Sequence, residues 1–480
     1  LAPSTVNSST FGKLFSCPVD GYIYAQPLYV PNLAIPGGGI HNVLFVATEN
    51  DSVYAFDADA NPCVQIWHTS LIPSGSRAIT TPNLIITSTD IVPLVGITGT
   101  PVIDINSSTI FAVAAFQTIG AALPSPQRLY ALDLATGALE IKTTGAPISS
   151  PLGQAFFFSP KYENQRAALL LDNGTVYVAF GSYGGEGDYN GWLFAYDSAS
   201  LNQTGAFEVT PGGFQGGIWQ SGGGPSADSN HNVFVVSGDG TLNVGRPEIN
   251  YDYGNSFLRL ANTGGLPLVD YFTPCDEASG QILGTTAPVL LPDSAGSSLQ
   301  PHLLMGGSKG GSLYVVNREN MGGYVGPCPD ASTRVQTIPV GSAIFGAPLF
   351  WNDNVYVAPA NGNLKSFTML NGVVASTPLS PQSPEQLGPQ GATPVISSNG
   401  TNNAILWLID SSGALAMPNT PAVLRAYDPA NLSNEIYSSA MAAASRDAAG
   451  LAVKFSVPTL ANGKVYVGTQ TEVDVYGLLK

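Results

Sequence analysis

Charged side chains are scarce in this 480-residue chain. They make up 10% of it, with 17 Lys and Arg against 33 Asp and Glu, for a formal net charge of −16. Nucleic acids and anionic membrane surfaces attract basic patches, so this balance argues against both as partners. Long apolar runs are missing as well, since segments such as 110–116 fall well short of the ~18 residues of a membrane span.

Cysteine is also scarce. The four cysteines, Cys17, Cys63, Cys275 and Cys328, include no CxxC pair, which excludes the usual spacing of a structural zinc site. No CxxCH motif is present, so the chain carries no attached haem. Four cysteines allow two disulfides or none.

Several features point to an extracellular protein. The chain begins at Leu1 rather than Met, which predicts that a leader was removed, and its Lys content is low. Asn-x-Ser/Thr sequons occur at Asn7, Asn50, Asn106, Asn173, Asn202, Asn399 and Asn431. Together these features predict a secreted glycoprotein.

An internal repeat organises the chain. An apolar strand, a turn and an aromatic strand read clearly in 42–59, 175–200 and 464–479, and the pattern recurs eight times. A shorter apolar element precedes each copy, as in 26–30. The residues alternate with period 2 and helical periodicity is nearly absent, so each unit predicts a four-stranded antiparallel sheet. One such sheet cannot bury both faces alone, so the repeat predicts an all-β, eight-bladed propeller.

The two ends of the chain complement each other. The last copy stops after its third strand, while 10–18 reads as a strand without a sheet. We therefore expect the N-terminal strand to complete the C-terminal blade and close the ring, which removes exposed edges. A single domain over 1–480 is predicted, with successive blades at 24–70, 100–145, 167–210, 223–273, 287–340, 347–378, 393–440 and 457–480.

The repeat resembles a known family. The motif in SVYAFD (52–57) and RLYALD (128–133) is similar to the quinoprotein repeat of propellers named for pyrroloquinoline quinone (PQQ) dehydrogenases. Segments such as YAQPLYVPN (24–32) and GSKGGSLYVVNRENMG (307–322) resemble, more closely, secreted proteins known only as PQQ-like repeat proteins. The resemblance implies the fold, whereas propellers host many activities.

The resemblance also implies cofactors to test. In the dehydrogenases, a quinone stacks between a tryptophan floor and a ring of two adjacent cysteines, with a calcium ion held by acidic and amide groups. Trp219 is the candidate floor, but this chain has no adjacent cysteines. PQQ and calcium stay open, and we expect no tightly held quinone.

Three departures separate the chain from its closer relatives. The resemblance implies a histidine at Phe345 and at Asn190, and an acid at Leu94, all on one face. Each is replaced by a residue that does not titrate, whereas general acid–base chemistry needs titratable groups. These departures count against a shared catalytic activity.

The loops between strands predict where a ligand binds. Connections from fourth to first strands and from second to third strands share one face, called here the funnel face. By this rule His41, His231 and His302 fall on the opposite face and His68 in an outer strand. We therefore expect no histidine-dependent mechanism.

The funnel face is predicted to be acidic and aromatic, which suits sugar hydroxyls. Its loops also bring Asp239, Glu248, Tyr183 and Tyr253. Lys309 and Arg246 are the cations best placed to meet an anionic ligand. The predicted ligand-binding residues are Trp219, Gln220, Glu186, Asp188, Tyr189, Trp192, Arg246, Tyr251, Asp252 and Lys309, with no metal ligand among them.

Two classes of function remain open. The first is a secreted, monomeric propeller whose axial funnel binds a small polar molecule or glycan. The alternative is an enzyme: a PQQ-dependent alcohol or sugar oxidoreductase, or a cofactor-free carbohydrate lyase or hydrolase. No catalytic residue is identified.

The cysteines occupy repeated positions. Cys17 and Cys275 each follow a fourth strand, and Cys63 and Cys328 each lie in the connection to the fourth strand of the next blade. Because a repeated geometry that permits one bridge should permit the other, we expect disulfides Cys17–Cys63 and Cys275–Cys328.

Overall fold

Antiparallel strands supply the regular structure of the chain. The computed structural model describes residues 1–81, 88–151, 158–244, 251–275, 282–324 and 335–479, and these contain no α-helix. Three short 3-10 turns are present, at Asp293–Ala295, Ser412–Leu415 and Ala443–Ser445. The predicted all-β class is therefore confirmed.

Within the described residues, six sheets have four strands and two have five. The first two sheets in chain order contain β2 (Leu28–Ile35), β3 (Gly39–Ala47), β4 (Ser52–Asp57) and β5 (Val64–Ser70), and then β8 (Val102–Asp104), β9 (Thr109–Ala114), β11 (Arg128–Asp133) and β12 (Ala146–Pro147). The third sheet contains β13 (Glu163–Asn164), β14 (Leu170–Asp172), β15 (Thr175–Ser182), β16 (Trp192–Asp197) and β17 (Gln203–Glu208). The fourth contains β18 (Ser226–Ala227), β19 (Val233–Val236), β22 (Phe257–Leu260), β23 (Leu268–Thr273) and β27 (Gly323–Tyr324).

The next three sheets continue the series. They are β24 (Val289–Leu290), β25 (Leu303–Gly307), β26 (Ser312–Asn317) and β28 (Val335–Pro339); β29 (Leu349–Trp351), β30 (Asn354–Val357), β31 (Lys365–Leu370) and β32 (Val373–Val374); and β33 (Val395–Asn399), β34 (Asn402–Asp410), β35 (Val423–Asp428) and β36 (Asn431–Ser438).

The last sheet joins the two ends of the chain. It contains β37 (Thr459–Ala461), β38 (Lys464–Gly468), β39 (Glu472–Leu478) and the N-terminal strand β1 (Phe11–Pro18). β1 runs antiparallel to β39, with Phe11 opposite Leu478 and Cys17 opposite Val473. The N-terminal strand therefore completes the C-terminal sheet, as its sequence predicts.

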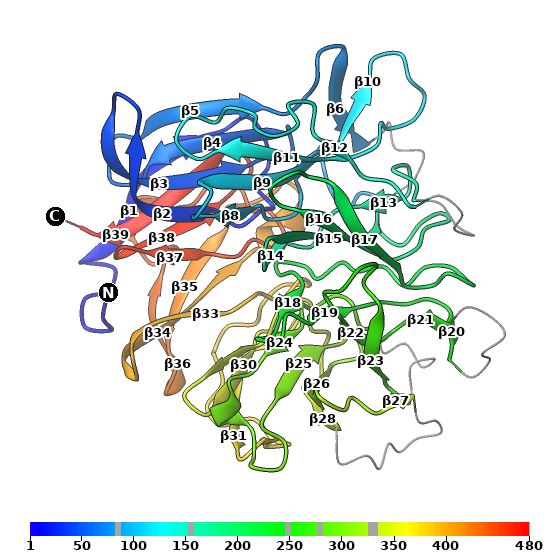
Figure 1. Cartoon of the computed structure of the whole chain (residues 1–480). Coiled ribbons are helices and arrows are strands. Elements are labelled where there is room, and N and C mark those ends of the chain that lie inside the picture. The colour runs from blue at the N-terminus through cyan, green and yellow to red at the C-terminus, as the bar shows by residue number, and fades with distance from the viewer. Residues whose placement is uncertain (82–87, 152–157, 245–250, 276–281, 325–334, 480) are drawn as a thin grey trace.

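Neighbouring sheets bury their apolar faces against each other. Phe45 of β3 and Ile110 of β9 share one core cluster, and later clusters join each sheet to the next along the chain. A further cluster joins Val475 of β39 to Val46 of β3. Figure 1 shows the sheets following one another around the molecule, with the red C-terminal strands beside the blue N-terminal ones.

Two small sheets are not part of the predicted repeat. β10 (Phe116–Thr118) and β7 (Leu94–Val95) flank β6 (Ser76–Thr80), and β20 (Leu242–Asn243) pairs with β21 (Asp252–Tyr253). They form within long connections, where extended segments pair locally, so the repeat pattern contains no signal for them.

Candidate functional site

Segments that precede the first strands of different sheets meet one another. Phe345 precedes β29 and Phe455 precedes β37, and their ring centroids lie 5.9 Å apart. A Cβ atom at Gly222, which precedes β18, would lie 3.2 Å from the backbone oxygen of Phe455. Connections from separate sheets thus converge here.

Arg166 and Lys454 lie over the Phe455 ring, Asp90 pairs with both, and Lys309 is near enough to influence the charge of Asp90. We call Asp90, Arg166, Lys309, Lys454, Phe345 and Phe455 the axial cluster. The Lys454 Nζ donates to Asp90 Oδ1 at 2.9 Å, and Arg166 Nη1 lies 3.8 Å from Asp90 Oδ2. Burial opposes the charge of Asp90, but Arg166 and then Lys454 outweigh it, so the pKa of Asp90 is lowered.

Arg166 is held in an unusual state. Its side chain is only 9% exposed and its guanidinium stacks over Phe455, 4.6 Å from the ring centroid. Among the described residues, its buried Nη2 has no hydrogen-bond partner. A buried guanidinium nitrogen with no acceptor is costly, so the site is electrostatically incomplete.

The pKa values of the two lysines, Lys454 and Lys309, are both lowered. Burial lowers the pKa of Lys454, and Arg166 lowers it further while Asp90 partly offsets both. Partial burial also lowers the pKa of Lys309; Asp90 and Asp239 oppose this shift, and Arg166 adds to it. An anion placed among these groups would relieve the repulsion among the cations.

The predicted floor, Trp219, is fixed by glycines. Cβ atoms built at Gly181, Gly217 and Gly238 would each lie within 3 Å of its indole, so only glycine permits this packing. Its Nε1 donates to the Ser182 oxygen at 3.0 Å. The indole remains partly exposed.

Gln220, the neighbour of Trp219, is fully buried and has no hydrogen-bond partner for its amide among the described residues. Its backbone φ is +45°. It is therefore a buried polar group and not a surface contact.

Three more of the predicted ligand contacts lie in the interior, as Gln220 does. Trp192 packs in a core cluster with Phe194, because it is part of strand β16. Tyr189 is buried against Trp219. Asp252 is buried and accepts from the Gly212 N–H at 2.7 Å. None of the three presents a free face to a ligand.

The other predicted contacts differ in exposure. Asp188, Tyr251 and Lys309 are exposed and Glu186 is half-buried. Arg246 lies outside the described residues, as does Glu248.

The three departures from the family pattern do not share one environment. Phe345 lies in the axial cluster, with its ring 5.9 Å from that of Phe455. Asn190 is buried instead and donates through Nδ2 to Glu208 Oε1 and to the Thr210 oxygen, both at 2.8 Å. Leu94 lies in the small strand β7.

Arg166 and Lys454 are the functional candidates that sequence reasoning missed. Each is an isolated cation in the segment before an innermost strand, in QRAALL and VKFSVPTL. A partial signal exists, since Tyr24, Phe345 and Phe455 each stand three residues before a proline of the repeated element. That alignment finds the two phenylalanines of the axial cluster but neither cation, because Lys454 stands four residues before Pro458 and no proline follows Arg166 in its element.

The histidines form local pairs away from the axial cluster. Nδ1 of His41, His231 and His302 lies 2.9, 2.9 and 2.8 Å from an aspartate oxygen of Asp57, Asp172 and Asp293, respectively. His68 stacks on Tyr54 in β4. His231 and His302 fall between first and second strands and His68 lies in an outer strand, as predicted, whereas His41 lies inside the second strand β3.

One predicted disulfide is confirmed, since Cys17 is bonded to Cys63. Cys275 is also disulfide-bonded, and its predicted partner Cys328 lies outside the described residues.

Five sequon asparagines are exposed, namely Asn106, Asn173, Asn202, Asn399 and Asn431. Asn7 and Asn50 are half-buried, and Asn50 Nδ2 donates to Asp20 Oδ2 at 2.8 Å. A glycan on Asn50 would have to displace this bond.

Calcium does not fit the axial cluster. In its described part, Asp90 is the carboxylate that pairs with the cations, and Arg166 and Lys454 already engage it, whereas calcium prefers several oxygen ligands. Elsewhere in the described ranges, no group of three or more His, Cys, Asp or Glu side chains is arranged to hold a metal ion.

No helix in the described part of the chain is long and apolar enough to cross a membrane.

Comparisons with known proteins place the fold. No family model and no curated protein matches the chain. Among solved structures, the quinohemoprotein alcohol dehydrogenase of Comamonas testosteroni is 13% identical with a TM-score of 0.58, covering 100% of this chain and 78% of that one. A europium-containing methanol dehydrogenase is 12% identical with a TM-score of 0.58, covering 100% and 95%.

A third match has a different name. BamB from Moraxella catarrhalis is 15% identical with a TM-score of 0.53, and the match covers 97% of each chain. Identities this low indicate architecture only. The chain therefore has a β-propeller fold like that of the quinoprotein dehydrogenases, a likeness that assigns it no activity.

Proposed function

We propose that this chain is a secreted, glycosylated and monomeric propeller of eight blades whose axial cluster binds a small polar ligand through an anionic group. The incomplete environment of Arg166 carries the proposal. Its side chain is 9% exposed, with an Nη2 that has no described partner. Arg166 and Lys454 share one paired carboxylate, Asp90, so a ligand carboxylate would supply the missing acceptor.

The ring proposal rests on the order of the core clusters. Each sheet packs on the next, and one cluster joins the C-terminal sheet to the sheet of β2 to β5. Deleting residues 1–18 removes β1 and exposes β39 as an edge. We expect the truncated protein to lose its cooperative unfolding transition, and an unchanged melting temperature would overturn closure by β1.

Calorimetric titration with matched ligands tests the binding proposal. Glucuronate is compared with glucose, and benzoate with benzamide, so that each pair differs in the carboxylate. We expect the charged member of at least one pair to bind about tenfold more tightly, with an affinity that falls as salt is raised. Equal affinity within both pairs, or no binding of either carboxylate, would contradict the proposal.

Variants locate the site. Arg166→Gln and Lys454→Gln should each weaken carboxylate binding about tenfold, because each removes a cation beside the ligand. Lys464→Gln is the matched control, since Lys464 pairs with Asp59 in a turn of the opposite face. If Lys464→Gln weakens binding as much as the axial variants do, the site lies elsewhere.

The alternative, a PQQ-dependent oxidoreductase, is favoured by the whole-length likeness to quinohemoprotein alcohol dehydrogenases. The poor fit of calcium counts against it. Dye reduction on alcohols or sugars after addition of PQQ and calcium would establish the alternative. A carbohydrate lyase or hydrolase has less support, because the described part of the axial cluster offers only Asp90 as a carboxylate.

A further inference from the structure

A cavity of about 350 Å³ lies beside the axial cluster. Its lining comes from four separate connections of the funnel face: residues 22–24, 89–92, 414–419 and 452–454, together with Gln470. Its size falls within the range of small-molecule sites.

The cavity has one charged end. Lys454 is the only charged side chain among its described lining residues, and the same Lys454 bonds Asp90 in the axial cluster. A ligand whose anionic group lies in the axial cluster would therefore extend past Lys454 into this space.

Much of the remaining wall is apolar or aromatic. Tyr22 and Tyr24 supply aromatic surface, and Val453 adds a buried aliphatic contact. Leu415 is 55% exposed and Met417 is 98% exposed, so two large apolar side chains stand at the rim with little covering them. Exposed apolar surface around a cavity is typical of a binding site.

Three polar side chains of the wall already have hydrogen-bond partners. Gln470 Nε2 donates to the Ala452 oxygen at 3.1 Å, and Asn419 Nδ2 donates to the Ala414 oxygen at 3.4 Å. The Tyr24 hydroxyl accepts from the Val92 N–H at 3.5 Å. Sugar hydroxyls would have to compete for these groups, whereas an apolar body needs none of them.

We infer that this cavity takes the apolar body of an amphiphilic carboxylate, an aromatic acid being the simplest case. The inference rests on the proposed function and deepens it: the axial cations hold the carboxylate, and the cavity selects an apolar ring over a hydroxylated one. Burial of the ring against the aromatic and aliphatic wall supplies the discrimination.

Titration with benzoate and glucuronate tests the inference, because both present a carboxylate on a six-membered ring. We expect benzoate to bind about tenfold more tightly than glucuronate. Leu415→Asn makes the rim polar and should remove most of this preference while leaving glucuronate affinity unchanged. Leu299→Asn is the matched control, because Leu299 is 90% exposed in another connection, and it should preserve the preference.

The outcomes separate the two proposals. If glucuronate binds as tightly as benzoate or more tightly, the apolar subsite is overturned while the anion-binding function stands. The subsite is also overturned if the preference survives in Leu415→Asn. Arg166→Gln should weaken both acids by the same factor, and if neither acid binds to the unmodified protein, the proposed function falls with the inference.

Discussion

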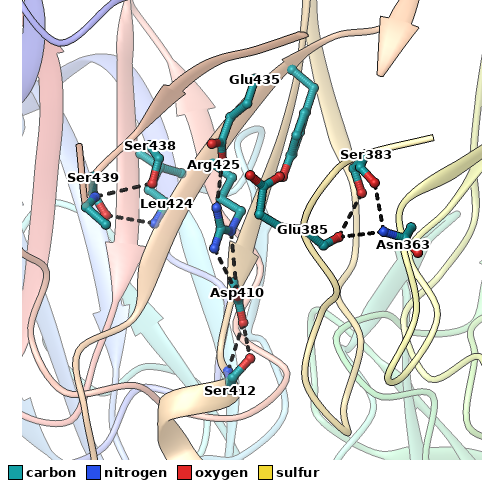
Figure 2. A network of polar contacts seen from close by, with 12 residues as sticks. Asn363, Ser383, Glu385, Asp410, Ser412, Leu424, Arg425, Glu435, Ser438 and Ser439 are labelled. Atoms are coloured by element: carbon teal, nitrogen blue, oxygen red, sulfur yellow. Dashed lines mark hydrogen bonds and ion pairs between the residues drawn. The ribbon is translucent and has the colours of Figure 1, made fainter. Parts of the chain in front are cut away.

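Two clusters of this propeller contain a largely buried arginine, and they differ in what surrounds it. Arg425 donates from Nη1 to Glu435 Oε1 at 2.7 Å and from Nη2 to Asp410 Oδ2 at 3.3 Å. Figure 2 shows these bonds within one connected network. Arg166 has instead one carboxylate at 3.8 Å, which it shares with Lys454.

The difference separates a structural network from a binding site. Burial disfavours the charge of Arg425, but Glu435 and Asp410 outweigh it, and the pKa of Arg425 is raised. Two carboxylates thus satisfy one cation there, whereas Asp90 alone pairs with both Arg166 and Lys454 among the described residues. A closed network holds its blade together, and an open one retains capacity for an acceptor from outside.

The largest expected effect is on stability. Arg425→Gln leaves two mostly buried carboxylates without their cation, so we expect a loss of about 3 kcal/mol in the free energy of unfolding. Arg166→Gln removes an uncompensated charge and one ring contact, so its cost should stay below about 1 kcal/mol. Urea denaturation of both variants measures the difference. Equal losses would show that the two arginines are both structural.

The fold could be predicted from the sequence, but most of the difference between the two arginine clusters could not. Period-2 alternation in segments such as 42–59 depends only on local pattern, and it predicts strands that the structure contains. The orphan strand 10–18 likewise predicts the pairing of β1 with β39. Both follow because each blade repeats one local rule.

The site depends on contacts between distant residues. Asp90, Arg166 and Lys454 come from three connections, and nothing local in their sequence reveals that they meet. Trp192 shows the limit of reading a loop from sequence. It follows an acidic loop, but it is the first residue of strand β16 and its indole is buried in the core. A shift of one or two residues at a strand end decides whether a side chain is buried.

The second expected effect is on the pH dependence of stability, and it concerns buried carboxyl groups that have no cation beside them. Glu163 is buried and accepts from Trp192 Nε1 at 3.2 Å, with no described cation partner. Burial raises its pKa from 4.5 to about 8, and burial raises that of Glu208 to about 7. Both groups therefore hold protons in the folded state that the unfolded chain releases.

The sign follows from this proton balance. Between about pH 4.5 and pH 8 the folded state binds more protons, so the free energy of unfolding falls as pH rises, by about 1.4 kcal/mol per pH unit for each fully shifted carboxyl. Urea midpoints measured across this range should decline. Glu163→Gln keeps the protonated shape and should flatten the decline, and an unchanged slope would exclude Glu163 as its source.

The smallest expected effect is a gain in carboxylate affinity, opposite in sign to the loss expected for Arg166→Gln and Lys454→Gln. Asp90 is the one described carboxylate that competes with a ligand for Arg166 and Lys454. Asp90→Asn removes that competitor but keeps an amide of the same shape, so carboxylate affinity should rise about fivefold at low salt and less at high salt. Asp59→Asn, beside Lys464, is the matched control and should leave affinity unchanged. Calorimetry decides between two roles for Asp90. Tighter binding of the carboxylate to Asp90→Asn would mean that Asp90 offsets excess positive charge. Weaker binding would mean that Asp90 orients Lys454 for the ligand. In that case the axial cluster would resemble the closed network around Arg425.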